Sequence, residues 1–225
     1  MPFAPLAAAL ALTLLLTLAR LGGTVDSDVA WQLWIGGRIH AGANLYTDII
    51  ETNPPLWFWV AVPVDRLADL LHIRVEAALV GVLGVVVALA LVATNRLTGY
   101  IAARQRGLLL CYAGLALLGA PWMHAGQREQ LVLIATLPYA ALIAARRRGH
   151  RVSVWLAAFI GIGAALGFAL KHYFLLVPLA LELWLFATAA QRRLLRPETL
   201  ALAAMAIAYA GALITFDPDF VTRIV

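Results

Sequence analysis

The chain has little charge, little serine and almost no cysteine. Only 13% of its 225 residues are charged, its single cysteine is Cys111, and its only serines are Ser27 and Ser153. One cysteine excludes an internal disulfide. The sequence also lacks a glycine-rich phosphate loop, an HExxH sequence and a Cys/His metal cluster. Serine-nucleophile, P-loop and zinc-protease chemistry therefore have no motif in this chain.

Apolar residues dominate instead, at 63% of the sequence with a mean hydropathy of +0.87. Uncharged runs of about the length that crosses a bilayer recur along the chain, without linkers or repeats. The first run lacks a basic flank, so we interpret it as a retained helix rather than a signal peptide. We predict one all-α domain, a polytopic transmembrane bundle with about seven spans: 3–20, 75–94, 107–123, 131–145, 152–170, 172–191 and 199–216.

Arginine clusters between these spans predict the orientation of the bundle. They fall in alternate loops, so a single topology places all of them in the cytoplasm. The formal net charge of +5 comes from these short clusters and does not indicate a nucleic-acid partner. The clusters are Arg96, Arg104 and Arg106; Arg146, Arg147, Arg148 and Arg151; and Arg192, Arg193 and Arg196.

The apolar segment 55–71 decides between seven and eight spans. If it crossed the membrane, the acidic first loop would lie on the basic face. If it does not, every acid except Glu182 and Glu198 lies outside. We therefore favour seven spans in a bacterial inner membrane, with the N-terminus in the cytoplasm.

Two interfacial helices are then expected in the first external loop. The segment 55–71 would place Trp57 and Trp59 at the level of the lipid headgroups. The segment 28–41 would be the second, ended by Gly42. On that segment Trp31, Trp34, Ile35 and Ile39 share one helical face.

In this topology, a group of acidic and basic residues lies together in the external loops. Carboxylates beside cations at a membrane surface suit a particular chemistry. The cations hold a lipid phosphate, and a carboxylate takes a proton from an acceptor hydroxyl. A carboxylate pair could instead hold a divalent cation such as Mg or Mn. The residues concerned are Asp26, Asp28, Asp48, Glu51, His124, Arg128, Glu129, Lys171 and His172.

Structural roles compete with each of these assignments. Asp26 and Asp28 are well placed to cap a helix that begins near Val29. Asp48 and Glu51 would serve equally to solvate a loop.

The later charges also have structural alternatives. Arg128 and Glu129 could pair with each other, and Lys171 could extend to the headgroups from a tight turn. Glu182 lies in the middle of a span, where it must be protonated or meet a polar partner within the bundle.

Three motifs carry a resemblance to a known family. They are Asp26-Ser-Asp28 after the first span, Gly42, Tyr46 and Asp48 leading to Asn53-Pro-Pro-Leu-Trp57, and Gly126-Gln-Arg-Glu129 in the next external loop. With these motifs the chain resembles the GT-C superfamily of integral-membrane glycosyltransferases. It looks most like the group that includes dolichyl-phosphate-mannose–protein mannosyltransferases and aminoarabinose lipid A transferases.

The resemblance implies an N-terminal module of seven spans with two interfacial helices, and a polyprenyl-phosphate sugar as donor. A carboxylate would activate the acceptor hydroxyl on the periplasmic face, and cations would hold the donor phosphate. The residues implied are Asp28, Asp26 and Glu129 as catalytic groups, and Arg128, Lys171, His172, His124, Asp48, Glu51 and Tyr46 in substrate binding.

The chain departs from the family in two ways. Many relatives carry Lys where this chain has Asn53, and relatives continue beyond the point where this sequence stops. We therefore expect that the module lacks a C-terminal part. A partner chain or a homo-oligomer would then complete it. The rival hypothesis is a non-catalytic subunit that binds, transports or assembles a lipid carrier. Catalysis, unlike that rival, requires Asp26 or Asp28, Glu129 and Lys171 to meet in one external cavity.

Overall fold

The computed structural model describes residues 4–122, 124–189 and 193–223, and within these ranges the fold is all-helical. Residues 3, 123, 190 and 191, at the ends of predicted spans, and Arg192 of the third arginine cluster lie outside the described residues. The elements are α1 (Ala4–Arg20), α2 (Ser27–His40), α3 (Leu56–Leu71), α4 (Val75–Leu97), α5 (Ala103–Gly114), the π-helical η1 (Leu115–Gly119), α6 (Arg128–Arg147), α7 (Val154–Phe168), the 3-10 helix η2 (His172–Leu175), α8 (Leu176–Thr188), α9 (Pro197–Phe216) and α10 (Pro218–Arg223).

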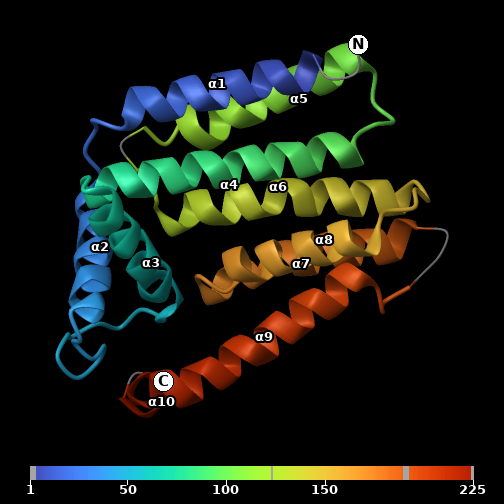
Figure 1. Ribbon diagram of the computed structural model, residues 1–225. Coiled ribbons are helices and arrows are strands. Elements are labelled where there is room, and N and C mark those ends of the chain that lie inside the picture. Colours follow the sequence, from blue (N-terminus) through green and yellow to red (C-terminus); the bar gives the residue numbers. More distant parts are fainter. Residues whose placement is uncertain (1–3, 123, 190–192, 224–225) are drawn as a thin grey trace.

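The long helices lie side by side and alternate in direction (Figure 1). Helix α4 packs on α1, α6 and α3, α6 packs on α7, and α7 packs on α9. Helices α2 and α3 contact each other and lie across one end of the stack, which we call the α2 end (Figure 1). The opposite end carries the described arginines of the three clusters and is called the arginine end. Within the described residues, each of the seven predicted spans overlaps a helical segment.

Three of the described helices are long and apolar enough to cross a membrane: α4, α6 and α9. Three shorter apolar helices cover Pro5–Arg20, Val154–Phe168 and His172–Thr188. Helix α5 begins with two arginines and changes to a π-helix after Gly114, so no uninterrupted apolar helix forms there. By length and composition, the described helices thus support a membrane protein but give fewer than the seven predicted spans.

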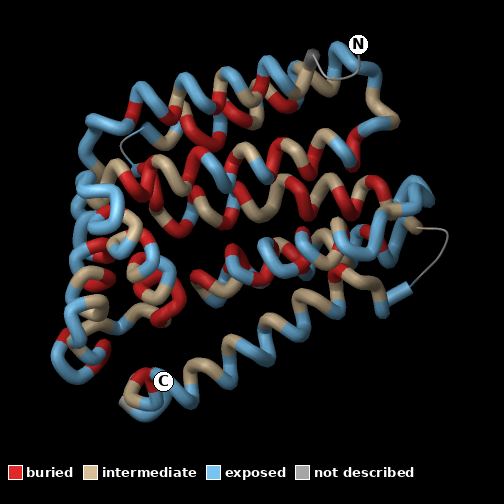
Figure 2. The backbone as a smooth tube through the Cα atoms, viewed as in Figure 1, coloured by how far each residue is buried: buried red, intermediate tan, exposed pale blue. Residues whose placement is uncertain are grey.

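Helix α9 shows an arrangement typical of lipid surroundings. Its one buried residue is Glu198, whereas Leu200, Ile207 and Ile214 are more than half exposed. Figure 2 accordingly shows α9 almost wholly in the exposed and intermediate colours. In water such a face would favour aggregation, whereas lipid accepts it at no cost.

Glu198 belongs to a polar network that joins three helices. Arg146 of α6 donates to both of its carboxylate oxygens at 3.0 Å, and Arg196 pairs with it at 3.0 Å. Arg196 also binds Glu182 of α8, which accepts a further hydrogen bond of 2.7 Å from the Tyr139 hydroxyl. Glu182 therefore has the polar partners that its position within a predicted span required.

Helices α2 and α3 pack closely because of a glycine. A Cβ atom added to Gly36 would lie 2.6 Å from Cβ of Ala61, so the two backbones meet at this point. Helix α2 ends at His40, just before Gly42, whose φ of +96° suits glycine. This agrees with the predicted end of the segment 28–41.

The predicted surface positions of the aromatic residues are partly wrong. Trp57 is only 1% exposed, because this face of α3 packs into the main core rather than facing the headgroups. Trp59 is half-buried and donates from its ring nitrogen to Asp217 at 2.8 Å. On α2, Ile35 is buried, whereas Trp31 and Trp34 face outwards and stack at 4.8 Å. The predicted common face of α2 is thus divided between core and surface.

Candidate functional site

A polar cavity of about 250 Å³ opens at the α2 end. It is bounded by the first turns of α2 and α6, the loop before α3, and the turn before η2. Five of the predicted site residues line it: Asp28, Glu51, Arg128, Glu129 and Lys171. The chain thus brings together charges that lie more than 140 positions apart in the sequence.

Asp26 lies beside the cavity and has a structural task. Its carboxylate caps α2 by accepting from the backbone N–H of Val29 at 3.0 Å. It also accepts from Gln127 at 2.5 Å, and Nδ1 of His124 lies 2.8 Å away. Burial alone would raise the pKa of Asp26, but the hydrogen bonds from His124, Val29 and Gln127 outweigh it and lower the pKa. The capping alternative is therefore correct for Asp26.

Asp28 differs from its neighbour. It stands in the first turn of α2, lines the cavity, is exposed, and its carboxylate accepts no hydrogen bond from the described residues. A carboxylate with free lone pairs on a cavity can accept a proton from a bound hydroxyl. Of the two predicted acids, Asp28 is the one whose carboxylate accepts no hydrogen bond from the described residues.

Arg128 supplies a buried cation. Its side chain is 6% exposed, and its guanidinium donates to the side-chain oxygen of Asn53 at 2.6 Å. The Nε atom of Arg128 is buried without a partner among the described residues, as is Oε1 of the neighbouring Gln32. Buried polar groups without partners cost about 1–3 kcal/mol each. An anionic, hydroxyl-bearing ligand in the cavity would supply such partners.

Glu129 and Lys171 form an ion pair across the cavity, with 2.6 Å between Nζ and Oε1. Glu129 thus pairs with Lys171 rather than with Arg128. Burial tends to lower the pKa of Lys171, but the hydrogen bond to Glu129 outweighs it and raises the pKa. Lys171 is therefore a fixed positive charge at neutral pH, and it lines the cavity.

Glu51 is held by the loop that carries it. It accepts hydrogen bonds from the backbone and side-chain nitrogens of Asn53 at 3.0 and 2.8 Å, and from the Trp31 ring at 3.1 Å. Burial would raise the pKa of Glu51, but these bonds lower it instead. Glu51 therefore orders the turn at Asn53. Its structural role is to accept specific hydrogen bonds, and not merely to solvate a loop.

Besides Asp26, four predicted residues do not reach the cavity lining. Asp48 folds back on its own loop, where it accepts from the backbone of Asn44 at 2.8 Å. The Tyr46 hydroxyl donates to the Asn53 carbonyl at 2.6 Å, which shapes the loop from behind. His124 forms a hydrogen bond with Asp26. His172 is exposed, and its ring contacts the Tyr173 ring.

The cavity also contains residues that the sequence did not single out as site residues. They are Trp31, Gln32, Asn53 and Gln127. Gln32 follows Asp28 by one helical turn, so a polar pair at this spacing on an otherwise apolar segment was the available signal. Gln127 lies within the Gly126-Gln-Arg-Glu129 motif, but the sequence does not show its contact with Asp26, 101 positions earlier.

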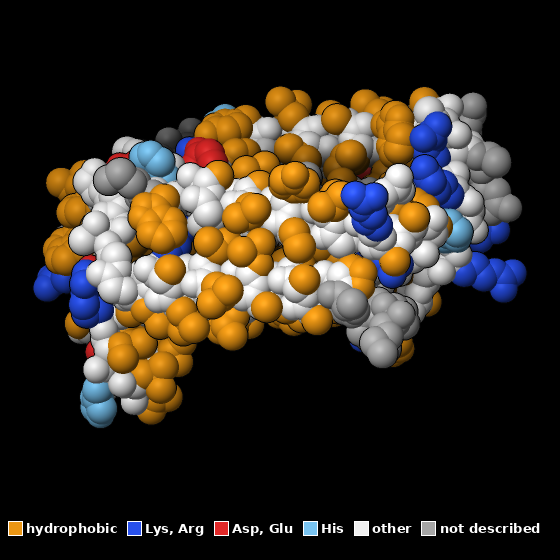
Figure 3. Space-filling model, turned by 90° about the horizontal axis from the view of Figure 1, so that it is seen from above, with side chains coloured by type: hydrophobic (Ala, Val, Ile, Leu, Met, Phe, Trp, Pro, Cys, Tyr) orange, Lys and Arg blue, Asp and Glu red, His pale blue; other side chains and the backbone are white. Residues whose placement is uncertain are grey.

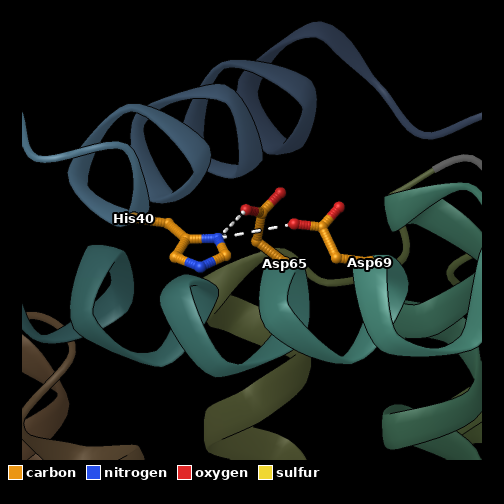
Figure 4. Close-up of side chains that lie close together, drawn as sticks. All are labelled: His40, Asp65 and Asp69. Carbon is orange, nitrogen blue, oxygen red and sulfur yellow. Dashed lines mark hydrogen bonds and ion pairs between the residues drawn. The ribbon is translucent and has the colours of Figure 1, made fainter.

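A candidate metal group lies elsewhere. Among the described residues, only His40, Asp65 and Asp69 bring three ligand atoms within 4.8 Å of one another (Figure 4). Nδ1 of His40 lies 2.8 Å from Asp65 and 3.7 Å from Asp69, whose side chain is 74% exposed. The first contact is a hydrogen bond that ties the end of α2 to α3. The three cavity acids do not form such a group, so the divalent cation considered from the sequence has no three-ligand site there in the described structure.

No protein-family model, curated protein or solved structure matches the chain.

Proposed function

We propose that the chain is a membrane glycosyltransferase module that moves a sugar from a polyprenyl-phosphate donor to an acceptor hydroxyl at the α2 end. One observation carries the proposal. Asp28, Arg128, Glu129 and Lys171 line a single cavity, as the sequence required for catalysis. A scaffold or assembly subunit has no need for that convergence.

The proposed membrane topology has seven spans, formed by α1, α4, α5 with η1, α6, α7, η2 with α8, and α9. Helices α2 and α3 would then lie at the external surface. The alternating helix directions (Figure 1) and the position of the cavity at the α2 end, away from the arginine end, support this arrangement. So do the exposed apolar side chains of α9. The N-terminus would be cytoplasmic, in a bacterial inner membrane.

The proposed chemistry is a direct displacement. The acceptor oxygen attacks the anomeric carbon of the sugar, and the Asp28 carboxylate takes the hydroxyl proton. The bond between the anomeric carbon and the phosphate oxygen breaks, and the polyprenyl phosphate leaves with the bonding electrons. Arg128 and Lys171 stabilise the charge that develops on the leaving phosphate.

The remaining residues position these groups. Glu129 holds Lys171, Asn53 holds Arg128, and Glu51 holds Asn53. A cavity of about 250 Å³ is slightly smaller than the usual range for ligand pockets, about 300–1,000 Å³, so it suits a sugar-phosphate headgroup rather than the polyprenyl chain.

The test is transfer of radiolabelled sugar from a panel of polyprenyl-phosphate sugars by the purified full chain. We expect Asp28→Asn to lower turnover by about 10²–10⁴-fold, the usual contribution of a general base. Asp48→Asn is the matched control, because Asp48 faces its own loop, and it should retain turnover.

Two outcomes would contradict the proposal. Equal transfer by Asp28→Asn and Asp48→Asn would remove the assigned base. Absence of transfer, together with polyprenyl-phosphate binding that weakens in Arg128→Ala, would favour the lipid-carrier-binding subunit instead.

A further inference from the structure

A second cavity, of about 520 Å³, lies at the arginine end, across the bundle from the proposed catalytic site. It is formed where the last turn of α4, the α4–α5 loop and the α6–α7 loop meet. Its polar lining comes from Arg96, Tyr100, His150, Arg151 and Ser153. Neither the sugar-transfer chemistry nor the α2 end uses any of these residues.

The charge of this cavity is positive and uncompensated. None of the described lining residues is acidic, and neither Arg96 nor Arg151 forms an ion pair with a described carboxylate. Arg146 and Arg196, by contrast, are paired with Glu198. The cavity therefore differs from its surroundings by having cations without counter-charges, and this favours an anionic occupant.

Its wall is ordered by ring contacts. The Tyr100 and His150 rings stack at 5.0 Å with 10° between their planes. The Arg148 guanidinium lies 4.5 Å from the centre of the Tyr100 ring, a cation–π distance. These contacts fix the two loops against each other, so the cationic side chains project from a defined framework.

Helix α7 adds donors to the same cavity. Ser153 precedes its first residue, makes no capping hydrogen bond with its side chain, and lines the cavity. The first turn of this 15-residue helix contains no acid. Its first backbone N–H groups and the positive end of its dipole therefore add to the Arg96 and Arg151 charges.

The neighbouring surface indicates which kind of anion would bind. Trp155 is 85% exposed and Val154 is 60% exposed, directly after Ser153. An exposed tryptophan beside arginines is typical of the membrane–water boundary. Arginine side chains also stand out beside hydrophobic ones at the right-hand end of the molecule in Figure 3. An occupant with a phosphate head and acyl chains would meet both surfaces.

We propose that this cavity binds the phosphodiester headgroup of an anionic phospholipid, with Arg96, Arg151 and Ser153 as its ligands and the acyl chains beside Trp155. Basic pockets between membrane helices on the cytoplasmic side are suited to such headgroups. The proposal rests on the membrane topology of the proposed function but not on sugar transfer.

The test is binding of phosphatidylglycerol, with zwitterionic phosphatidylcholine as the comparison, to the purified full chain in detergent by native mass spectrometry. We expect preference for phosphatidylglycerol, and a dissociation constant about fivefold higher in Arg96→Ala or Arg151→Ala, which is the loss of roughly 1 kcal/mol per arginine. Arg104→Ala removes the same charge from an exposed position outside the cavity and should bind as the parent does.

Three results would overturn the proposal. They are equal binding of the two lipids, equal weakening in Arg104→Ala and Arg151→Ala, and binding of glycerol 3-phosphate as tight as that of phosphatidylglycerol. The last would mean a free-anion site rather than a lipid site. Arg151→Lys should restore part of the affinity, which separates a lost charge from a misfolded loop. Sugar transfer by the Arg151→Ala variant should be unchanged, so this proposal and the proposed function can fail separately.

Discussion

At the scale of the residue, Asp26 and Asp28 illustrate how position decides the task of a side chain. They are two residues apart, yet Asp26 accepts hydrogen bonds from α2 and from the α6 approach, whereas Asp28 keeps its carboxylate free. Capping and catalysis were alternatives for both in the sequence. The structure assigns capping to Asp26 and leaves proton transfer to Asp28 as a prediction.

The capping role has a measurable pH dependence. The pKa of Asp26 is lowered on folding, so its stabilisation is fully present above the unfolded value, near pH 4, and is lost as the pH falls through the folded value. We expect Asp26→Ala to cost about 1 kcal/mol at pH 7. The difference in melting temperature from the parent should shrink below about pH 4.

Asp28→Asn is the control for this experiment. The Asp28 carboxylate accepts no hydrogen bond from the described residues, and its contribution to Arg128 is one of charge alone. The unfolding free energy of Asp28→Asn should therefore stay within about 0.5 kcal/mol of the parent value. A gap between parent and Asp26→Ala that does not change with pH would contradict the assigned role of the ionised carboxylate.

At the scale of the element, the close contact of α2 and α3 depends on one missing side chain. Gly36→Ala should force the backbones apart, because the new Cβ would lie 2.6 Å from that of Ala61. Overpacking of this kind costs about 1–3 kcal/mol. Thermal unfolding in detergent measures it.

The controls for this contact lie in the same chain. Gly81 has no atom within 4 Å of its added Cβ, so Gly81→Ala should be neutral or stabilising by up to about 1 kcal/mol. The double substitution Gly36→Ala with Ala61→Gly removes the 2.6 Å contact but leaves the backbone carbon of residue 61 at 3.0 Å, so it should recover only part of the stability. Equal effects of Gly36→Ala and Gly81→Ala would exclude close packing as the reason for the glycine.

Sequence patterns predicted where helices form better than they predicted which side chains of those helices are buried. Each long apolar run became helical, because apolar length and composition are local properties. The π-helix at Leu115–Gly119 was not foreseen, because distant side chains hold its carbonyls: Gln130 donates to that of Leu117 at 2.6 Å. The inward position of Trp57 was also missed, since the rotation of α3 depends on the helices that it meets.

At the scale of the whole molecule, the Glu198 network adds charge pairs to the contacts by which α9 packs on α7. Glu198 is fully buried and paired with two arginines. Glu198→Gln leaves those cations under-compensated, so we expect a loss of about 3–5 kcal/mol. Chemical denaturation in detergent measures the loss.

Glu76→Gln provides the comparison. Glu76 pairs at 3.3 Å with Arg74, which is 56% exposed. Surface pairs of this kind contribute about 0–1 kcal/mol. If the two substitutions proved equally mild, the attachment of α9 would have to come from its other contacts with α7.

The alternating directions of the helices in the whole molecule explain which part of the site could be predicted. Alternating helices bring every second loop to one end, so Arg128, Glu129 and Lys171 could be placed beside Asp28 by counting spans. Counting cannot tell which side chains face inwards, and His172 and Asp48 were therefore assigned to a cavity that they do not line.

Arg20, the last residue of α1, is 5% exposed, and its guanidinium donates to the carbonyls of Leu118, Pro121 and Trp122. These carbonyls belong to the segment that leads from η1 to His124 and Gln127, the partners of Asp26. A residue that touches no candidate ligand thus fixes the path of the chain into the site. In a genetic screen for inactive alleles, changes at Arg20 should be recovered together with those at Asp28, and intragenic suppressors of them should map to residues 118–127.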